Sequence, residues 1–180
     1  MARATATRLS YELSCARLLE LGMLADDTYP PMPDRLPQQD DEVLGVSVFR
    51  TRLDDDLDLS GLTLRRTFFG RSEINRVSFR NSDLRESNLC WNDFIGTDFA
   101  RADLAGSDMR SSIFKQVLFV AANLDGADLR GSSFLNCDFK RASMKGTVLT
   151  YQQVEMMQLS NPQKREIAWR KDEGEEPKGG

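Results

Sequence analysis

Histidine is absent from this chain of 180 residues, and cysteine is scarce, with only Cys15, Cys90 and Cys137. The absence of histidine removes the side chain that most often serves as a general base and as a metal ligand. Three scattered cysteines are too few for a disulfide framework or a zinc site. The sequence therefore predicts a protein without catalytic residues, metal or cofactor, and places an enzyme last among the function classes.

The chain also lacks long apolar runs and a strong excess of one charge. No stretch approaches the roughly 20 apolar residues that cross a bilayer, and Arg8, Glu12 and Arg17 interrupt the apolar residues near the N-terminus, unlike in a signal peptide. The net charge is −4 overall, and residues 57–151 carry 13 basic and 11 acidic side chains. These features predict a cytoplasmic protein with no membrane association and no direct binding to nucleic acid.

A repeat of five residues dominates the middle of the chain. Every fifth position from Leu59 to Leu149 is Leu, Phe, Ile or Met, without a failure in nineteen positions. This period fits neither an amphipathic helix nor a strand, and it indicates a repeat architecture. The residue two places before each large apolar residue is small at sixteen of the nineteen positions. One large and one small side chain in every five are therefore expected to fill a narrow interior.

The pattern in ARADLAGSDM (residues 100–109) and AANLDGADLRG (residues 121–131) resembles that of the pentapeptide-repeat family. The resemblance covers about 95 of the 180 residues. It implies an all-β solenoid, a right-handed quadrilateral β-helix with four pentapeptides in each coil, in which residues twenty apart stack about 4.8 Å from one another. Leu44 and Phe49 fall in the phase of the repeat and Asp54 breaks it, so we expect an irregular first coil.

Segments of a different composition flank the repeat, which gives the solenoid helical N- and C-terminal extensions. Residues 1–24 are predicted to be an N-terminal helical segment, with Leu9, Leu13 and Ala16 on the apolar face of a helix over 6–24. Residues 25–42 are predicted to be a linker because they are rich in proline and acidic residues. The β-helix is then expected over 43–150 and to be regular from 57.

Beyond the repeat, residues 151–172 are predicted to be a C-terminal helical cap, with helices over 152–159 and 162–171. The second of these helices would carry Ile167 and Trp169 as its apolar residues. Residues 173–180 are predicted to be a disordered tail. Because a solenoid has two open ends with unpaired edges, we interpret both helical extensions as caps.

Several apolar residues occupy positions that should face water. In the four-sided geometry Ile95, Lys115 and Leu135 share one stacked column, Ile113 lies on the same face, and two more apolar residues lie around the next corner. A contiguous apolar area of this kind marks an interaction site. The predicted partner-binding residues are Ile95, Ile113, Leu118, Val120 and Leu135.

An alternative leaves this patch without a partner, because the N-terminal helix or the segment around Trp169 would fold over it. A second apolar group, made of Phe68, Cys90 and Trp91, is expected on a different face, under residues 1–50. An acidic set recurs one residue before the large apolar positions, and we interpret it as turn-forming rather than catalytic. Its members are Asp83, Asp93, Asp98, Asp103, Asp108, Asp128 and Asp138.

Two function hypotheses follow. The first is a non-enzymatic protein–protein interaction protein that presents a rigid surface and neutralises a toxin or regulates one partner protein. The second comes from the resemblance: quinolone-resistance members of the family are dimeric rods that imitate duplex DNA and protect type II topoisomerase (gyrase). That resemblance implies a homodimer through a terminal cap. A DNA mimic needs a strongly negative face, which the net +2 of residues 57–151 does not supply.

Overall fold

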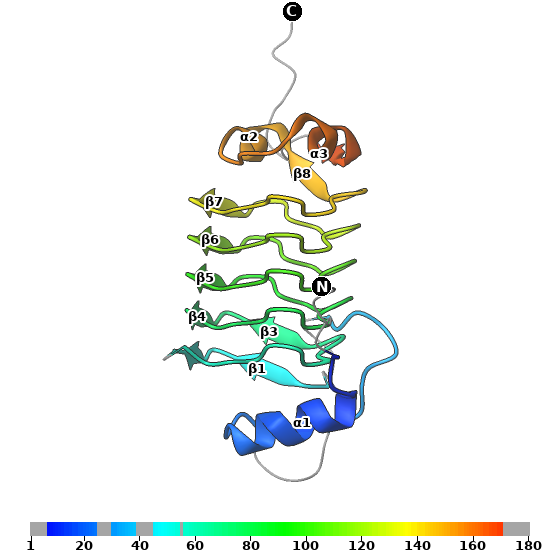
Figure 1. Ribbon diagram of the computed structural model, residues 1–180, viewed down its shortest axis with the longest axis vertical. Coiled ribbons are helices and arrows are strands. Elements are labelled where there is room, and N and C mark those ends of the chain that lie inside the picture. The colour runs from blue at the N-terminus through cyan, green and yellow to red at the C-terminus, as the bar shows by residue number, and fades with distance from the viewer. Residues whose placement is uncertain (1–6, 25–29, 39–44, 55, 171–180) are drawn as a thin grey trace, which may run out of the picture.

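The computed structural model describes residues 7–24, 30–38, 45–54 and 56–170. Within these ranges the chain winds into a right-handed, four-sided β-helix whose strands are all parallel, with helical segments at both ends (Figure 1). The predicted fold class is therefore confirmed. The predictions for residues 1–6, 25–29, 39–44 and 171–180, the tail included, lie outside the described residues.

One face of the coil forms a continuous parallel sheet, in the order β2-β4-β5-β6-β7. The other faces are joined mostly by isolated bridges, such as those between Asp98 and Leu118 and between Leu118 and Asp138. Two further sheets pair β1 with β3 and β8 with β9. The strand bounds are β1 Ser47–Phe49, β2 Arg52–Leu53, β3 Phe68–Gly70, β4 Glu73–Asn75, β5 Asp93–Ile95, β6 Ile113–Lys115, β7 Ser133–Leu135, β8 Val148–Thr150 and β9 Ala168–Arg170.

Residues twenty apart stack along most of the rod, as in the register of Phe94 on Phe114 and of Phe114 on Phe134. The first coil is irregular, as predicted, because Leu53 pairs with Ile74, one residue further on. The assignment of Phe49 to the repeat phase is wrong. Val48 pairs with Phe69 and is buried, whereas Phe49 is exposed.

The interior consists of columns of like side chains. Phe79, Phe99, Phe119 and Phe139 stack with ring centroids 5.1, 5.5 and 4.9 Å apart, and a neighbouring column of phenylalanines meets this one edge to face. Leucine and methionine fill the opposite side. Offset stacked and edge-to-face pairs are the favoured arrangements of aromatic rings, so the coil repeat places each ring in a favourable contact. The second column is Phe94, Phe114 and Phe134.

One buried polar side chain interrupts the small positions. Asn92 donates from Nδ2 to the carbonyls of Phe69 and Leu89, at 2.7 and 2.8 Å, and accepts at Oδ1 from the Ser72 amide at 2.9 Å. Its own amide donates to the Ser112 hydroxyl. The side chain is fully buried and fully paired, so its polarity is compatible with the core.

The corners of the coil share one backbone conformation. Every fifth residue from Gly61 to Gly146 has a positive φ, and most of these eighteen residues are not glycine. A positive φ at the third residue of a tight turn reverses the chain direction, as in a type II turn. Valine, isoleucine and threonine do not occur at these corners, in keeping with the steric cost of branched side chains in the left-handed region.

Helix α1 (Tyr11–Glu20) lies across the N-terminal end of the stack (Figure 1). It is shorter than predicted, and its buried face is Ser14, Cys15 and Leu18 rather than Leu9 and Leu13, which are exposed. The polar residue Ser14 explains why this face, and not the face of Leu9 and Leu13, is buried. The Ser14 hydroxyl accepts from the Thr63 amide at 2.8 Å, so the helix supplies a partner for the open edge of the coil.

The proline-rich segment does not run free of the solenoid over its described residues. The Pro33 carbonyl accepts from the Arg66 guanidinium at 2.7 Å, and the Pro37 carbonyl accepts from the Asn88 amide nitrogen at 3.0 Å. The Pro30 carbonyl accepts from the Tyr11 hydroxyl. Residues 30–38 therefore lie against one face of the first coils.

The C-terminal cap is a modified coil. Helix α2 (Tyr151–Glu155) and helix α3 (Asn161–Glu166) replace two sides, and β9 then pairs with β8 at a spacing of twenty residues. The prediction that Trp169 lies in a helix is wrong, because it lies in β9 opposite Leu149. Val154 and Leu159 are buried and continue the five-residue phase beyond Leu149.

Two glutamines complete the hydrogen bonds of the last regular coil. Gln153 Nε2 donates to the carbonyls of Leu129 and Ser132, at 2.6 and 2.8 Å. Gln163 Nε2 donates to those of Phe139 and Ala142. Within the rod the equivalents of these carbonyls have partners from the coils themselves: Met109 O accepts from Ser132 Oγ, and Ser112 O and Ala122 O accept from the amides of Ser133 and Ser143. The two glutamine side chains thus donate hydrogen bonds to carbonyl groups at the end of the regular coils, where no further regular coil follows.

We expect Phe119→Ala to lower the free energy of unfolding by about 3 kcal/mol or more, because it leaves a cavity in the middle of the ring column. Phe119→Leu should cost less, since leucine fills most of the volume. Urea unfolding followed by circular dichroism measures both. Equal stability of the two variants would contradict the role assigned to the column.

We expect Gln153→Ala to lower the free energy of unfolding by about 1–3 kcal/mol, because two carbonyls and the Thr150 amide lose their partner in a buried site. Gln152→Ala is the matched control, since Gln152 is adjacent and exposed, and it should change stability by less than about 0.5 kcal/mol. Thermal unfolding monitored by circular dichroism distinguishes the two. A stable Gln153→Ala would show that the cap does not depend on these bonds.

Candidate interaction surface

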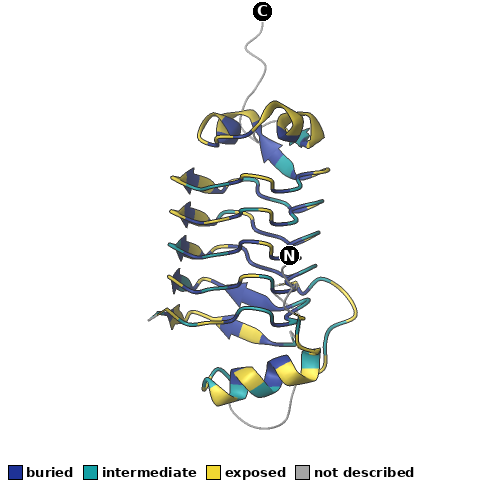
Figure 2. Ribbon diagram, in the orientation of Figure 1, coloured by how far each residue is buried: buried dark blue, intermediate teal, exposed yellow. Residues whose placement is uncertain are grey.

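The sheet of β5, β6 and β7 places apolar side chains on its outer face. Alternation along each strand turns Phe94, Phe114 and Phe134 inward, and the flanking residues turn outward. Ile113 is 48% exposed and Leu135 is 54% exposed. In Figure 2 these short strands lie along one edge of the rod, and in β6 and β7 exposed residues stand on either side of a buried centre.

The apolar area continues around the next corner. Leu118 is 40% exposed and stands where the coils before and after it have Asp98 and Asp138. In those coils the aspartate accepts a hydrogen bond from the amide two residues on. The leucine supplies no such bond and presents its side chain to solvent instead.

The predicted patch is less uniform than the sequence suggested. Ile95 and Val120 are only partly exposed, and Lys115 lies between Ile95 and Leu135 in their column. The most exposed predicted residues are Ile113, Leu118 and Leu135, and we call these three the apolar trio. Binding of a partner by these residues stays a prediction.

Over the residues that the structure describes, neither the N-terminal segment nor the C-terminal segment covers the apolar trio. Helix α1 lies at the far end of the rod (Figure 1), and Trp169 stacks on Tyr151 with ring centroids 4.6 Å apart and nearly parallel planes. The structure therefore does not support the alternative in which these segments fold over the patch, because all three side chains remain exposed.

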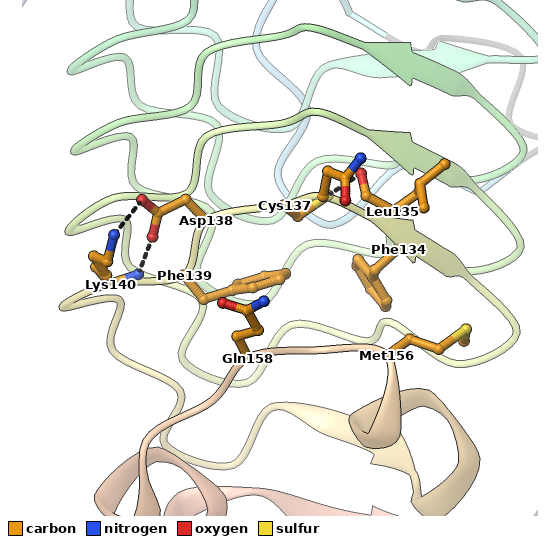
Figure 3. Close-up of a pocket in the computed structure, with 9 residues that line it drawn as sticks. Phe134, Leu135, Cys137, Asp138, Phe139, Lys140, Met156 and Gln158 are labelled. Atoms are coloured by element: carbon orange, nitrogen blue, oxygen red, sulfur yellow. Dashed lines mark hydrogen bonds and ion pairs between the residues drawn. The ribbon is translucent and has the colours of Figure 1, made fainter.

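A hollow of about 550 Å³ opens beside the apolar trio, between the last regular coil and the segment that follows α2. Figure 3 shows Phe134, Phe139 and Met156 around it, with Leu135 and Lys140 on the coil side. It forms because the chain leaves the coil path after α2, so that no further side covers this corner. Sequence reasoning missed the hollow, since no residue pattern marks it.

The second apolar group is only partly covered. Phe68 and Cys90 are buried, and Phe68 meets the ring of Phe49 at 5.9 Å. Trp91 is 58% exposed, so the expectation that residues 1–50 cover it is wrong. It occupies a corner with a positive φ, which directs its side chain away from the coil.

The acidic residues serve the turns, as predicted for most of them. In Asp83, Asp98, Asp103, Asp108, Asp128 and Asp138 a carboxylate oxygen accepts from the backbone amide two residues later. Several of them also pair with a cation at that same position. Asp108 binds Arg110 through both oxygens, at 2.9 and 2.7 Å. The Arg85 guanidinium and amide hold the pKa of the buried Asp83 carboxyl below its ordinary value, against the effect of desolvation.

The described part of the chain offers little reactive chemistry. It contains no cluster of three or more metal-ligating side chains. Desolvation raises the pKa of all three thiols, Cys15, Cys90 and Cys137. No helix among the described residues is long and apolar enough to cross a membrane.

Comparison with known families gives one clear assignment. The family described as pentapeptide repeats matches in eight copies, over residues 55–90, 72–111, 93–116 and 112–150. These matches span more than half of the chain, which therefore belongs to the pentapeptide-repeat family. No curated protein gives a significant match.

Solved structures of the same family resemble this one. A pentapeptide repeat protein from the thylakoid lumen of Arabidopsis thaliana is 29% identical, with a TM-score of 0.51, over 53% of this chain and 67% of its own. Rfr23 from the cyanobacterium Cyanothece is 22% identical, with a TM-score of 0.44, over 57% of this chain and 62% of its own. A trypsin-treated form of QnrB1, a plasmid-mediated fluoroquinolone resistance protein, is 16% identical, with a TM-score of 0.31, over 58% of this chain and 59% of its own.

We expect the three thiols to react slowly with iodoacetamide at pH 7.5 in the folded protein, because a raised pKa lowers the fraction of reactive thiolate. The rates should rise with pH and should reach that of free cysteine in guanidinium chloride. Mass spectrometry of the alkylated protein measures each site. A thiol that reacts at the free rate in the folded protein would contradict this expectation.

Proposed function

We propose that this chain is a non-enzymatic interaction protein, which uses the apolar trio to bind one protein partner and thereby neutralises a toxin or regulates that partner. The observation that carries the proposal is the exposure of Ile113, Leu118 and Leu135 on a rod whose own caps leave them uncovered. Exposed apolar side chains that gather in one area are characteristic of binding surfaces.

The rigidity of the surface supports the proposal. Leu118, at the centre of the surface, is held by backbone hydrogen bonds to the coils on both sides, from Leu118 N to Thr97 O and from Phe99 N to Leu118 O. The surface is therefore preorganised, and binding incurs little cost in backbone ordering. The interior is filled by buried phenylalanine, leucine and methionine and leaves no room for a substrate, which favours binding over catalysis.

The charge pattern does not favour the alternative, a DNA mimic that modulates gyrase. Asp83, Asp108 and Asp128 each pair with an arginine two residues later, and Asp98 pairs with Arg80. The acids are therefore interleaved with cations rather than gathered into the continuous negative face that imitation of a phosphate backbone needs.

We expect Leu118→Asp combined with Ile113→Asp to abolish capture of the partner in an affinity purification followed by mass spectrometry, because carboxylates cannot replace the apolar contacts. Both positions are exposed, so the circular dichroism spectrum and melting temperature should stay close to those of the wild type.

Leu13→Asp is the matched control, because Leu13 is an exposed leucine on α1, at the other end of the rod. Its captured proteins should be those of the wild type. If the double variant captures the same proteins as the wild type and the control, the apolar trio is not the binding surface.

A further inference from the structure

The hollow between the last coil and the cap has the features of an anchoring site. Phe134, Phe139, Leu135 and Met156 line it, beside the polar side chains of Asp138, Lys140 and Gln158 (Figure 3). Leu135 and Met156 are 54% and 53% exposed, whereas Phe134 and Phe139 are buried, so most of the accessible apolar surface of the hollow belongs to Leu135 and Met156. Its volume of about 550 Å³ exceeds that of any single side chain.

The hollow is continuous with the surface already assigned to a partner. Leu135 belongs both to the apolar trio and to the wall of the hollow. In protein interfaces the largest contributions come from a few side chains that fill pockets near the centre of the contact. A partner that covers the trio would therefore reach the hollow without a second, separate contact.

The charges around the hollow favour an acidic partner. Lys140 lines it and pairs with Asp138 at 3.3 Å, while its side chain remains largely exposed. The side chain of Lys140 is 82% exposed and that of Asp138 is 31% exposed, so the cation is the more accessible member of this pair. The acids close to it are Asp138, already paired, and Glu155 of α2.

We propose that the hollow receives one large apolar side chain of the protein partner, and that a carboxylate beside that side chain pairs with Lys140. This inference rests on the proposed function and specifies the chemistry of the partner. The chain's own residues 171–180 cannot serve as the occupant, because they contain acids but no large apolar side chain. The partner segment therefore combines an aromatic residue, leucine or methionine with neighbouring aspartate or glutamate.

The test is the selection of a random peptide library, displayed on phage, against the full chain. Enriched peptides should carry a large apolar residue next to aspartate or glutamate. Synthetic, fluorescein-labelled versions of these peptides, measured by fluorescence anisotropy, should bind Met156→Glu at least tenfold more weakly than the wild type. They should bind Lys140→Glu at least threefold more weakly.

Gln152→Glu is the matched control for Met156→Glu, because it makes the same change of charge at an exposed position of α2 outside the hollow. Binding to this variant should match the wild type, and thermal unfolding checks that all variants are folded. Enrichment of basic or uncharged peptides, equal binding to Met156→Glu, or no enrichment at all would overturn the proposal. A dimer seen by light scattering and lost in Met156→Glu would show that a second copy is the occupant, and would also overturn it.

The test of the hollow and the test of the proposed function can fail independently of each other. If the partner is lost with the Leu118 and Ile113 variants but kept with Met156→Glu and Lys140→Glu, the apolar trio binds it and the hollow does not. If the peptides bind the hollow while the trio variants still capture the partner, the proposed surface is wrong and the anchoring site stands.

Discussion

Backbone pairing between residues twenty apart is the constraint on which the rest of this structure depends. In the regular part of the rod each coil donates hydrogen bonds to its neighbours and accepts them, so each side chain lies above its equivalent twenty residues earlier. The sequence must then place compatible residues in each column. Phenylalanine stacks on phenylalanine inside the rod, and outside it Arg85 contacts the carboxylates of both Asp83 and Asp103, one coil apart.

The same constraint creates the need for caps. At the ends of the stack the backbone groups have no next coil, and an open edge of this kind invites uncontrolled pairing. Both caps supply polar side chains that form hydrogen bonds with these backbone groups. Ser14 does so at one end, and Gln153 and Gln163 do so at the other. The cap that follows β8 departs from the coil path to do so, and the hollow next to Leu135 is a by-product of that departure.

The repeat could be predicted from the sequence because the column constraint appears there at every fifth residue, independent of distant contacts. The caps could be predicted only in outline. Pro162 correctly marks the start of a helix, but Trp169 joins a strand because of its pairing with Leu149, which local propensity does not reveal. The sequence did hold one signal that the cap is a modified coil: the apolar Val154 and Leu159 continue the five-residue spacing beyond Leu149, and both are buried in the structure.

The candidate surface was predictable for a related reason. Apolar residues at outward positions are conspicuous against a strict repeat, and Ile113, Leu118 and Leu135 are indeed exposed. What the sequence could not give was the degree of exposure of Ile95 and Val120, which depends on how neighbouring side chains lie across the corner. The hollow depends on the path of residues 156–158 and has no counterpart in any residue pattern.

Because the register of the middle coils is uniform, the length of the rod is set by the number of coils. A gain or loss of twenty residues in this region would leave every column chemically intact and would lengthen or shorten the rod by about 4.8 Å. The distance between α1 and the hollow near Met156 would thus change in steps of one coil while both ends keep their structure. A gain or loss of five residues would instead rotate one end by a quarter turn against the other. It would change the direction in which the outer surface faces relative to α1.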